Sequence, residues 1–214
     1  MLYHRTKWSA DAYNQLTEAT FGYPTFGYMY FLNSTESAPL IEKNVGQFSM
    51  RVHLETDKPK LESFLSLVYP NDVSIWKTDL CPVGKAEEWI TAGRTTPLPS
   101  WETKLDRAYR IALFKSGGMT GPTNWYRSVL RDVDAEAVDA IPPANLILKQ
   151  PVLFIGGSID YVTRPEIMQS IADQGKAEGW LPDIQVKIIN DASHWVLLEK
   201  HREVTDLLIG VAKK

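Results

Sequence analysis

Two loops in the last third of the chain carry the residue types of an acid–base pair. Asp160 ends the loop 156–160 (GGSID), and His194 lies in the later loop 190–195 (NDASHW). The first loop follows a short apolar, β-branched run at residues 151–155, and the second follows another expected strand at residues 184–189 (IQVKII). Functional groups of parallel sheets collect at the carboxyl ends of the strands. We therefore expect Asp160 and His194 to lie at one edge of a sheet, from neighbouring strands.

Such a pair can act as a general base. A carboxylate beside an imidazole fixes the tautomer of the ring and raises its basicity. An isolated aspartate or an isolated histidine is more often structural, so the indication of catalysis is the shared position of Asp160 and His194 after consecutive strands. No metal or cofactor is expected at this site.

The elements that position the pair follow a strand–helix–strand–helix order, which is typical of a parallel α/β sheet. The run 151–155 is continuous and apolar, which predicts a strand buried on both faces. Upstream, the pattern is nearly all helix and loop, so we expect two regions, 1–140 and 141–214. Helices are expected at residues 9–20, 38–44, 61–69, 86–92, 104–115, 123–131, 165–178, 195–200 and 203–213. Residues 28–33 either begin a helix or continue a loop.

The composition predicts an ordinary soluble globular protein. The net charge is -3, which gives no sign of the basic surface that nucleic acids need. The one cysteine, Cys81, cannot form an internal disulfide, and no apolar run is long enough to span a membrane. The N-terminus lacks the apolar core of a secretory signal. We expect a cytoplasmic protein without a membrane or nucleic-acid partner.

Aromatic residues are concentrated in the first two thirds of the chain. Most of them are expected to pack between helices. A smaller number, together with a few hydroxyl groups, could line an apolar substrate pocket. The candidates for that pocket are Phe26, Tyr30, Trp125 and Trp195.

Several segments resemble the epoxide hydrolase family of α/β-hydrolases. The tail, PVLFIGGSIDYV followed by NDASHWVLLEKHREV, is similar to the end of such an enzyme. PTFGYMYF and GPTNWYR resemble the two lid segments whose tyrosines hydrogen-bond the epoxide oxygen, and the matching positions are Tyr28 and Tyr126. FLSLVYPND, IWKTD and TPLPSW are similar to the fungal soluble members. The resemblance implies a helical lid, residues 1–140, followed by a C-terminal remnant of the hydrolase sheet.

The chain departs from the family in two ways. It contains no His-Gly pair and no Gly-x-Ser-x-Gly or Gly-x-Asp-x-Gly turn, so the family's oxyanion loop and nucleophile aspartate are missing. We therefore expect an N-terminally truncated member that cannot form the covalent ester within this chain. The stretch Val45–Lys60 interrupts a usually short link, either as a real insertion or as a gene-model artefact.

Three hypotheses remain for function. The preferred one is an epoxide-opening enzyme of small-molecule biosynthesis, in which Tyr28 and Tyr126 are acids and Asp160 and His194 form a base, giving a rearranged or cyclised product. The second is an epoxide hydrolase that adds water directly, or with a separate chain that supplies the missing half. The third is a non-catalytic remnant that binds a ligand or partner. Fold alone does not decide between them.

The expected sheet is too small to stand alone. A two-stranded sheet is marginal, and an open apolar edge is an aggregation hazard. We therefore expect a homodimer in which the strands at 152–155 meet near a twofold axis.

Overall fold

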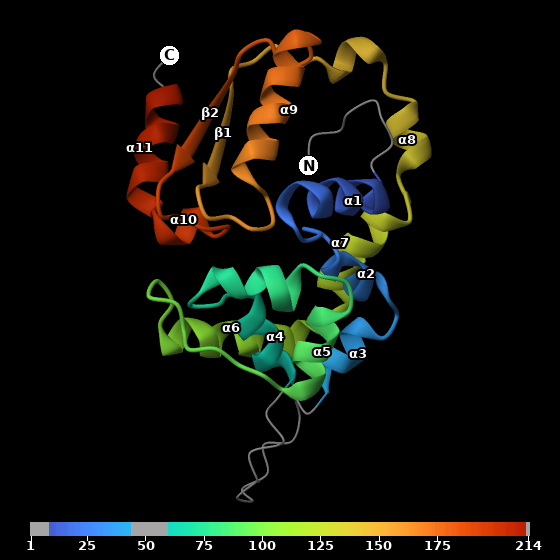
Figure 1. Cartoon of the computed structure of the whole chain (residues 1–214), viewed down its shortest axis with the longest axis vertical. Helices are drawn as coiled ribbons and strands as arrows, with labels where there is room; N and C mark the ends of the chain where they lie inside the picture. The colour runs from blue at the N-terminus through green and yellow to red at the C-terminus, as the bar shows by residue number, and fades with distance from the viewer. Residues whose placement is uncertain (1–8, 44–59, 213–214) are drawn as a thin grey trace, which may run out of the picture. The chain divides into compact units, whose positions relative to one another are not determined.

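The computed structural model describes residues 9–43 and 60–212. The chain divides into two compact units, of which one ends at Val133 and the other begins at Asp134. The first is made of helices, and the second contains a pair of strands with helices (Figure 1). The boundary expected after residue 140 lies slightly later than this division, because the short helix α8 (Ala135–Asp139) groups with the second unit.

Each helix expected in the first region has a counterpart in the helical unit. The helices are α1 (Ala10–Phe21), α2 (Tyr28–Asn33), α3 (Ser37–Glu42), α4 (Lys60–Val68), α5 (Lys85–Ala92), α6 (Lys104–Gly117) and α7 (Thr120–Leu130). The side chain of Ser9 accepts a hydrogen bond from the amide of Ala12 and so caps α1. Residues 28–33, which the sequence left open, form α2. Two irregular turns, the 3₁₀ turn η1 (Val73–Ile75) and the π turn η2 (Trp76–Leu80), were not expected from the sequence.

The core of the helical unit lies where α2, α3, α4 and α5 meet. In this unit α2 packs against α7, α4 packs against α5, and α3 contacts both α4 and α5. Ile41, Leu65 and Ile90 are almost completely buried there. Trp76 is also buried, and its indole nitrogen donates a 2.7 Å hydrogen bond to the carbonyl of Leu67. This bond satisfies the polar end of a large apolar side chain and fixes η2 on α4.

The second unit has the expected β-α-β-α order. Strands β1 (Val152–Gly157) and β2 (Ile184–Ile189) pair in parallel, from Val152 opposite Ile184 to Gly157 opposite Ile189. Helix α9 (Pro165–Ala177) connects them, and α10 (Val196–Glu199) and α11 (His201–Ala212) follow β2. A short 3₁₀ turn, η3 (Pro143–Leu146), precedes β1. Among the described residues this sheet has two strands.

Helices α9 and α11 flank the two strands on opposite sides (Figure 1). On one face Ala172, Leu181 and Ile184 form a buried cluster against which Phe154 packs. On the other face Ile189 and Val204 belong to a separate cluster with Ala192 and Val196, and Ile155 packs against it.

The expectation that β1 is buried on both faces was wrong for most of the strand. Its first four residues are only partly buried, and burial is complete only at Gly156 and Gly157. The apolar run does contact a helix on each side, as its composition predicted. It stays partly exposed because β2 pairs with only one of its edges.

The expected insertion, Val45–Lys60, lies outside the described residues except for Lys60, which begins α4. None of the helices within the described ranges is both long enough and apolar enough to cross a membrane.

Candidate active site

Asp160 and His194 are in contact, as the sequence predicted. Nδ1 of His194 lies 2.9 Å from Oδ2 of Asp160. Oδ1 of the same carboxylate accepts hydrogen bonds of 2.8 and 2.9 Å from the amides of Val162 and Thr163. Asp160 is only 4% exposed, and burial without partners would destabilise its carboxylate. The two amides and the imidazole supply those partners.

The loops after β1 and β2 are held together by their backbones. Ser158 donates its amide to the carbonyl of Ile189, and its hydroxyl accepts a 3.0 Å hydrogen bond from the amide of Asp191. A Cβ at Gly157 would lie 2.2 Å from the carbonyl oxygen of Ala192 and 2.4 Å from that of Ser193. Only glycine allows the two loops to approach this closely, and the approach brings Asp160 to His194.

Glu199 of α10 also holds the loop 190–195 that carries His194, which we call the histidine loop. Its carboxylate accepts a 2.7 Å hydrogen bond from the amide of Ser193 and another from the Ser193 hydroxyl. This contact could not be predicted from the sequence, because a glutamate on a short helix is usually a surface residue. The tryptophan that follows the histidine, Trp195, places its ring edge-on to the imidazole, with centroids 5.2 Å apart.

The arrangement is suited to general-base chemistry. With a carboxylate at Nδ1, the neutral imidazole carries its proton on that nitrogen, and Nε2 becomes the basic one. The amides on Asp160 and the glutamate on Ser193 hold both partners in place, so the ring is oriented before any substrate binds.

Tyr28 and Tyr126 are in contact within the helical unit. Tyr28 is the first residue of α2, and Tyr126 lies on α7. Their rings meet edge to face, with centroids 6.0 Å apart and an interplanar angle of 77°. Burial, and to a smaller extent the charge that Tyr69 can carry, raises the pKa of Tyr126 above its ordinary value. The phenol of Tyr126 therefore stays protonated across the neutral range and can donate a hydrogen bond or a proton.

Helix α1 holds the segment that leads into Tyr28. The side-chain oxygen of Asn14 accepts a 2.8 Å hydrogen bond from the amide of Phe26, and the hydroxyl of Thr17 accepts one of 3.1 Å from the amide of Thr25. Next along the chain is Gly27, where a Cβ would lie 2.3 Å from the carbonyl oxygen of Cys81. The backbone before Tyr28 is thus fixed by buried polar side chains and by close contact with the segment after η2.

The other aromatic residues expected in a pocket of the helical unit do not all lie near the two tyrosines. The ring of Phe26 stacks on Tyr13 at 4.9 Å and contacts the ring of Tyr28 edge-on at 6.4 Å. Tyr30 instead donates its hydroxyl to Asp11 on α1. Trp125 is 68% exposed and lies at the surface of the helical unit. Of the three expected pocket aromatics in this unit, only Phe26 joins the tyrosine pair.

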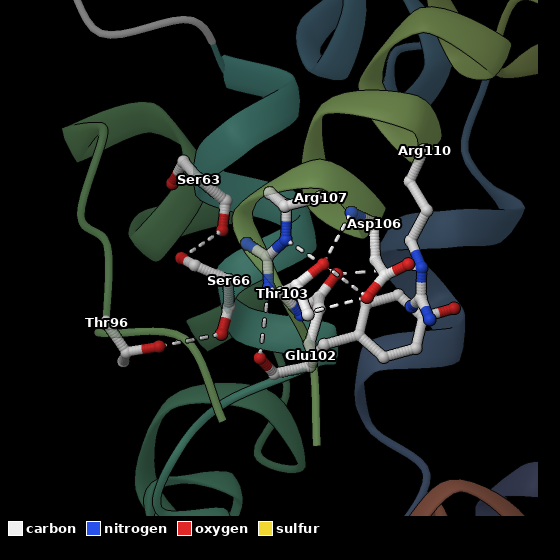
Figure 2. A network of polar contacts seen from close by, with 9 residues as sticks. Ser63, Ser66, Thr96, Glu102, Thr103, Asp106, Arg107 and Arg110 are labelled. Carbon is white, nitrogen blue, oxygen red and sulfur yellow. Dashed lines mark hydrogen bonds and ion pairs between the residues drawn. The ribbon is translucent and has the colours of Figure 1, made fainter. Parts of the chain in front are cut away.

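The helical unit contains a buried ion pair that could not be predicted from the sequence (Figure 2). Glu102, whose side chain is 0% exposed, accepts hydrogen bonds of 3.1 and 2.6 Å from Arg107. The guanidinium of Arg107 also donates to the carbonyl of Tyr69, at 3.3 Å. Arg110 lies 3.6 Å from Glu102 and stacks over the ring of Tyr69, 4.1 Å from its centroid. The five-residue spacing of Glu102 and Arg107 is not a helical ion-pair spacing, so no sequence pattern pointed to the contact.

Within residues 9–43 and 60–212, no group of three or more His, Cys, Asp and Glu side chains could hold a metal ion.

The chain has epoxide hydrolases among its relatives. It is 32% identical to "Bifunctional epoxide hydrolase 2" of Mus musculus over 159 residues, which are 72% of this chain and 26% of the mouse protein. It is 30% identical to "Epoxide hydrolase A" of Mycobacterium tuberculosis over 112 residues, covering 52% of this chain and 32% of that protein. No protein-family model matches the chain.

Solved structures of epoxide hydrolases share the fold. An epoxide hydrolase from an endophytic Streptomyces matches with a TM-score of 0.64 and 24% identity, over 95% of this chain and 55% of that one. The epoxide hydrolase VrEH1 from Vigna radiata matches with a TM-score of 0.59 and 20% identity, over 100% of this chain and 59% of that one. The chain thus has homologues among epoxide hydrolases and folds like part of an α/β-hydrolase, and it spans little more than half the length of these structures.

The buried ion pair gives a stability prediction. Glu102→Gln leaves the guanidinium of Arg107 buried without a counter-charge, and we expect a loss of about 3 kcal/mol in the free energy of unfolding. Urea denaturation followed by circular dichroism measures the loss. Glu88→Gln is the matched control, because Glu88 pairs with Lys85 at the surface, where the expected change is within about 0.5 kcal/mol. Equal losses in the two variants would contradict the prediction.

Proposed function

We propose that this chain opens epoxides, with Tyr28 and Tyr126 as paired acids. The observation that carries the proposal is the edge contact of the two phenols on α2 and α7, in a chain whose homologues are epoxide hydrolases. Two donors aimed at one oxygen stabilise the negative charge that develops when a strained C–O bond breaks. Tyr126 keeps its proton at neutral pH, as a hydrogen-bond donor must, while its raised pKa makes it a weaker acid than an exposed tyrosine.

The preferred reaction is a rearrangement or cyclisation. The sequence contains no Gly-x-Asp-x-Gly turn, and the proposed step accordingly uses no aspartyl ester. In the proposed step the phenols donate to the epoxide oxygen, its C–O bond breaks, and a hydroxyl of the same substrate bonds to the released carbon. His194 takes the proton of that hydroxyl, a phenol protonates the new alkoxide, and proton exchange with the solvent restores both residues. The product is an isomer of the substrate, as in small-molecule biosynthesis, and no cofactor is consumed.

The second candidate is hydrolysis, which the relatives named epoxide hydrolase favour. Here His194, oriented by Asp160, removes a proton from water. The water oxygen bonds to the carbon, the C–O bond breaks, and a phenol protonates the alkoxide, so that substrate and water give a diol. The segments FLSLVYPND, IWKTD and TPLPSW further support a fungal soluble type of enzyme.

Replacing either tyrosine tests the acid role. Tyr28→Phe and Tyr126→Phe each remove one donor, and we expect each to lower kcat for an aryl epoxide such as styrene oxide by ~10²-fold or more. Tyr109→Phe is the matched control, because Tyr109 is exposed on α6 and its loss is expected to leave the rate unchanged. Full activity in both single variants would remove the two tyrosines from the mechanism.

Turnover in ¹⁸O-labelled water separates the two reactions. An isomeric product without label indicates rearrangement, and a labelled diol indicates hydrolysis. If His194 is the base in either reaction, His194→Ala is expected to lower the rate at least ~10²-fold, whereas His201→Ala, at the exposed start of α11, leaves it unchanged. A purely acid-driven opening would instead tolerate the loss of His194. No turnover of any epoxide would favour the non-catalytic, ligand-binding role.

The partner proposal concerns the edge of β1 that faces away from β2, which no strand of residues 9–43 and 60–212 covers; we call it the open edge. The amides of Val152 and Ser158 donate to the carbonyls of Asp183 and Ile189, so even-numbered residues of β1 face β2. The amides and carbonyls of odd-numbered residues, such as Leu153, face away from it. An unpaired strand edge invites another strand. We propose that a second copy of the chain covers this edge.

We expect a homodimer with an interface above ~2,000 Å². Size exclusion coupled to light scattering at low micromolar concentration is expected to give twice the 24.2 kDa mass of one chain. Leu153→Pro removes an amide on the open edge without removing one that faces β2, so it is expected to weaken the dimer while the monomer stays folded. A stable, active monomer of the unaltered chain would overturn the proposal.

A further inference from the structure

Arg127 of α7 and Arg131, the residue that caps the end of α7, reach the carboxyl end of α2. Arg127 donates from Nη2 to the carbonyl of Ser34 at 2.7 Å and from Nε to that of Asn33 at 3.4 Å. Arg131, one turn later, donates from Nη2 to the Asn33 carbonyl at 2.7 Å and from Nε to the Asn33 side-chain oxygen at 2.8 Å. Asn124 orients Arg127 with a further 2.8 Å hydrogen bond. We call Arg127 and Arg131 the α2 clamp.

The α2 clamp satisfies backbone groups that the helix itself leaves unpaired. The last carbonyls of any helix lack partners within the helix, and they carry partial negative charge. Two guanidinium groups supply charge-assisted donors to them, and the planar fork of arginine fixes direction as well as distance. The four bonds to Asn33 and Ser34 therefore constrain both the rotation and the sliding of α7 against α2.

Glu42 holds the other end of α7. Its Oε1 accepts a 2.5 Å hydrogen bond from the amide of Met119, immediately before α7 begins. A carboxylate at this position compensates the unpaired amides and the positive end of the helix. Glu42 is the last residue of α3, so α7 is attached at its start to α3 and in its second half to α2.

We propose that Arg127 and Arg131 are positioning residues, which hold the phenol of Tyr126 in register with that of Tyr28. The inference rests on the proposed acid role of the two tyrosines. Arg127 directly follows Tyr126, and the clamped residues Asn33 and Ser34 end the same short helix that Tyr28 begins. The ring contact and the α2 clamp are thus two points of attachment along one pair of helices, and together they fix the relative position of the phenols.

This positioning matters for a two-donor acid. Both phenols must come within about 2.7–3.1 Å of one oxygen in the transition state. A displacement of about 1 Å at such a site can cost ~10²-fold in rate even when the altered residue is remote from the substrate. Movement of α7 on α2 changes the distance between the two donors without removing either of them. Loss of the clamp is therefore expected to affect kcat more than KM.

The test compares graded variants of the clamp. Arg127→Met is expected to lower kcat for styrene oxide by ~10–100-fold, with KM changed less than ~3-fold. Arg127→Lys keeps the charge and can make one of the bonds, so it is expected to recover part of the rate. Arg131→Met is expected to have a smaller effect of the same kind. Arg94→Met is the matched control. It removes the 2.6 Å ion pair between Arg94 and Asp79 of η2 and leaves the bonds between α2 and α7 in place.

A second readout follows the tyrosine itself. Movement of α7 exposes Tyr126 to water, so its raised pKa falls toward the ordinary value of about 10. Activity that needs the protonated phenol is lost as pH rises through this pKa, so the alkaline limb of the kcat profile moves to lower pH in Arg127→Met. Tyrosinate absorbance, compared with and without Tyr126→Phe, measures the same pKa without turnover.

The outcomes separate the inference from the function on which it rests. Lost activity in Tyr126→Phe, together with an unchanged kcat and an unchanged Tyr126 pKa in Arg127→Met, would overturn the clamp and keep the acid role. A lowered pKa in Arg127→Met, with no effect of Tyr126→Phe on turnover, would keep the structural link but remove its catalytic meaning. An equal loss of rate in Arg94→Met would reduce the effect to general destabilisation and overturn the proposal.

Discussion

The parallel pairing of β1 with β2 is the constraint on which the α/β unit depends. Its register places Gly157 opposite Ile189, so both strands end at the same level and release their loops side by side. A side chain at Gly157 would collide with the carbonyls of the histidine loop, so the missing Cβ allows the loops to touch. Asp160 and His194 meet because of this contact. A shift by one residue would reverse the faces of the strands and separate the pair.

The helical unit relies on charges that meet helix ends and on one buried ion pair. Glu42 sits at the start of α7, and Arg127 binds the end of α2. Glu102 and Arg107 pair near the start of α6, where burial makes each charge costly without the other. These interactions are directional, unlike the apolar contacts of the core. The directional interactions therefore fix the helices in one arrangement. This matters because several of these helices have fewer than ten residues and little stability of their own.

Much of this structure could be predicted from the sequence. Helical spacing and a capping serine located α1, an apolar run located β1, and the loops after the two expected strands located Asp160 and His194. Contacts between residues remote in sequence could not be found in this way. Nothing in the local pattern links Glu42 to Met119, or Glu199 to the loop before it. The aromatic residues could not be assigned from the sequence either. Tyr30 and Trp125 lie close to the two tyrosines in sequence, but Tyr30 binds Asp11 of α1 and Trp125 is exposed at the surface.

The energetics of a two-tyrosine acid constrain the reaction that it can support. One donor of this kind lowers a barrier by about 3 kcal/mol, so two give ~10⁴-fold, which is below the ~10⁶-fold or more that enzymes usually reach. The remainder must come from the group that attacks the carbon. Holding the attacking group in place contributes about 7–11 kcal/mol when it is positioned as part of the same molecule. A hydroxyl already on the substrate brings this advantage with it even in the absence of the protein, whereas a free water must be held in place by the site. The proposed isomerisation therefore requires less of the site than the addition of water does, because the site has only to orient a group that the substrate already carries.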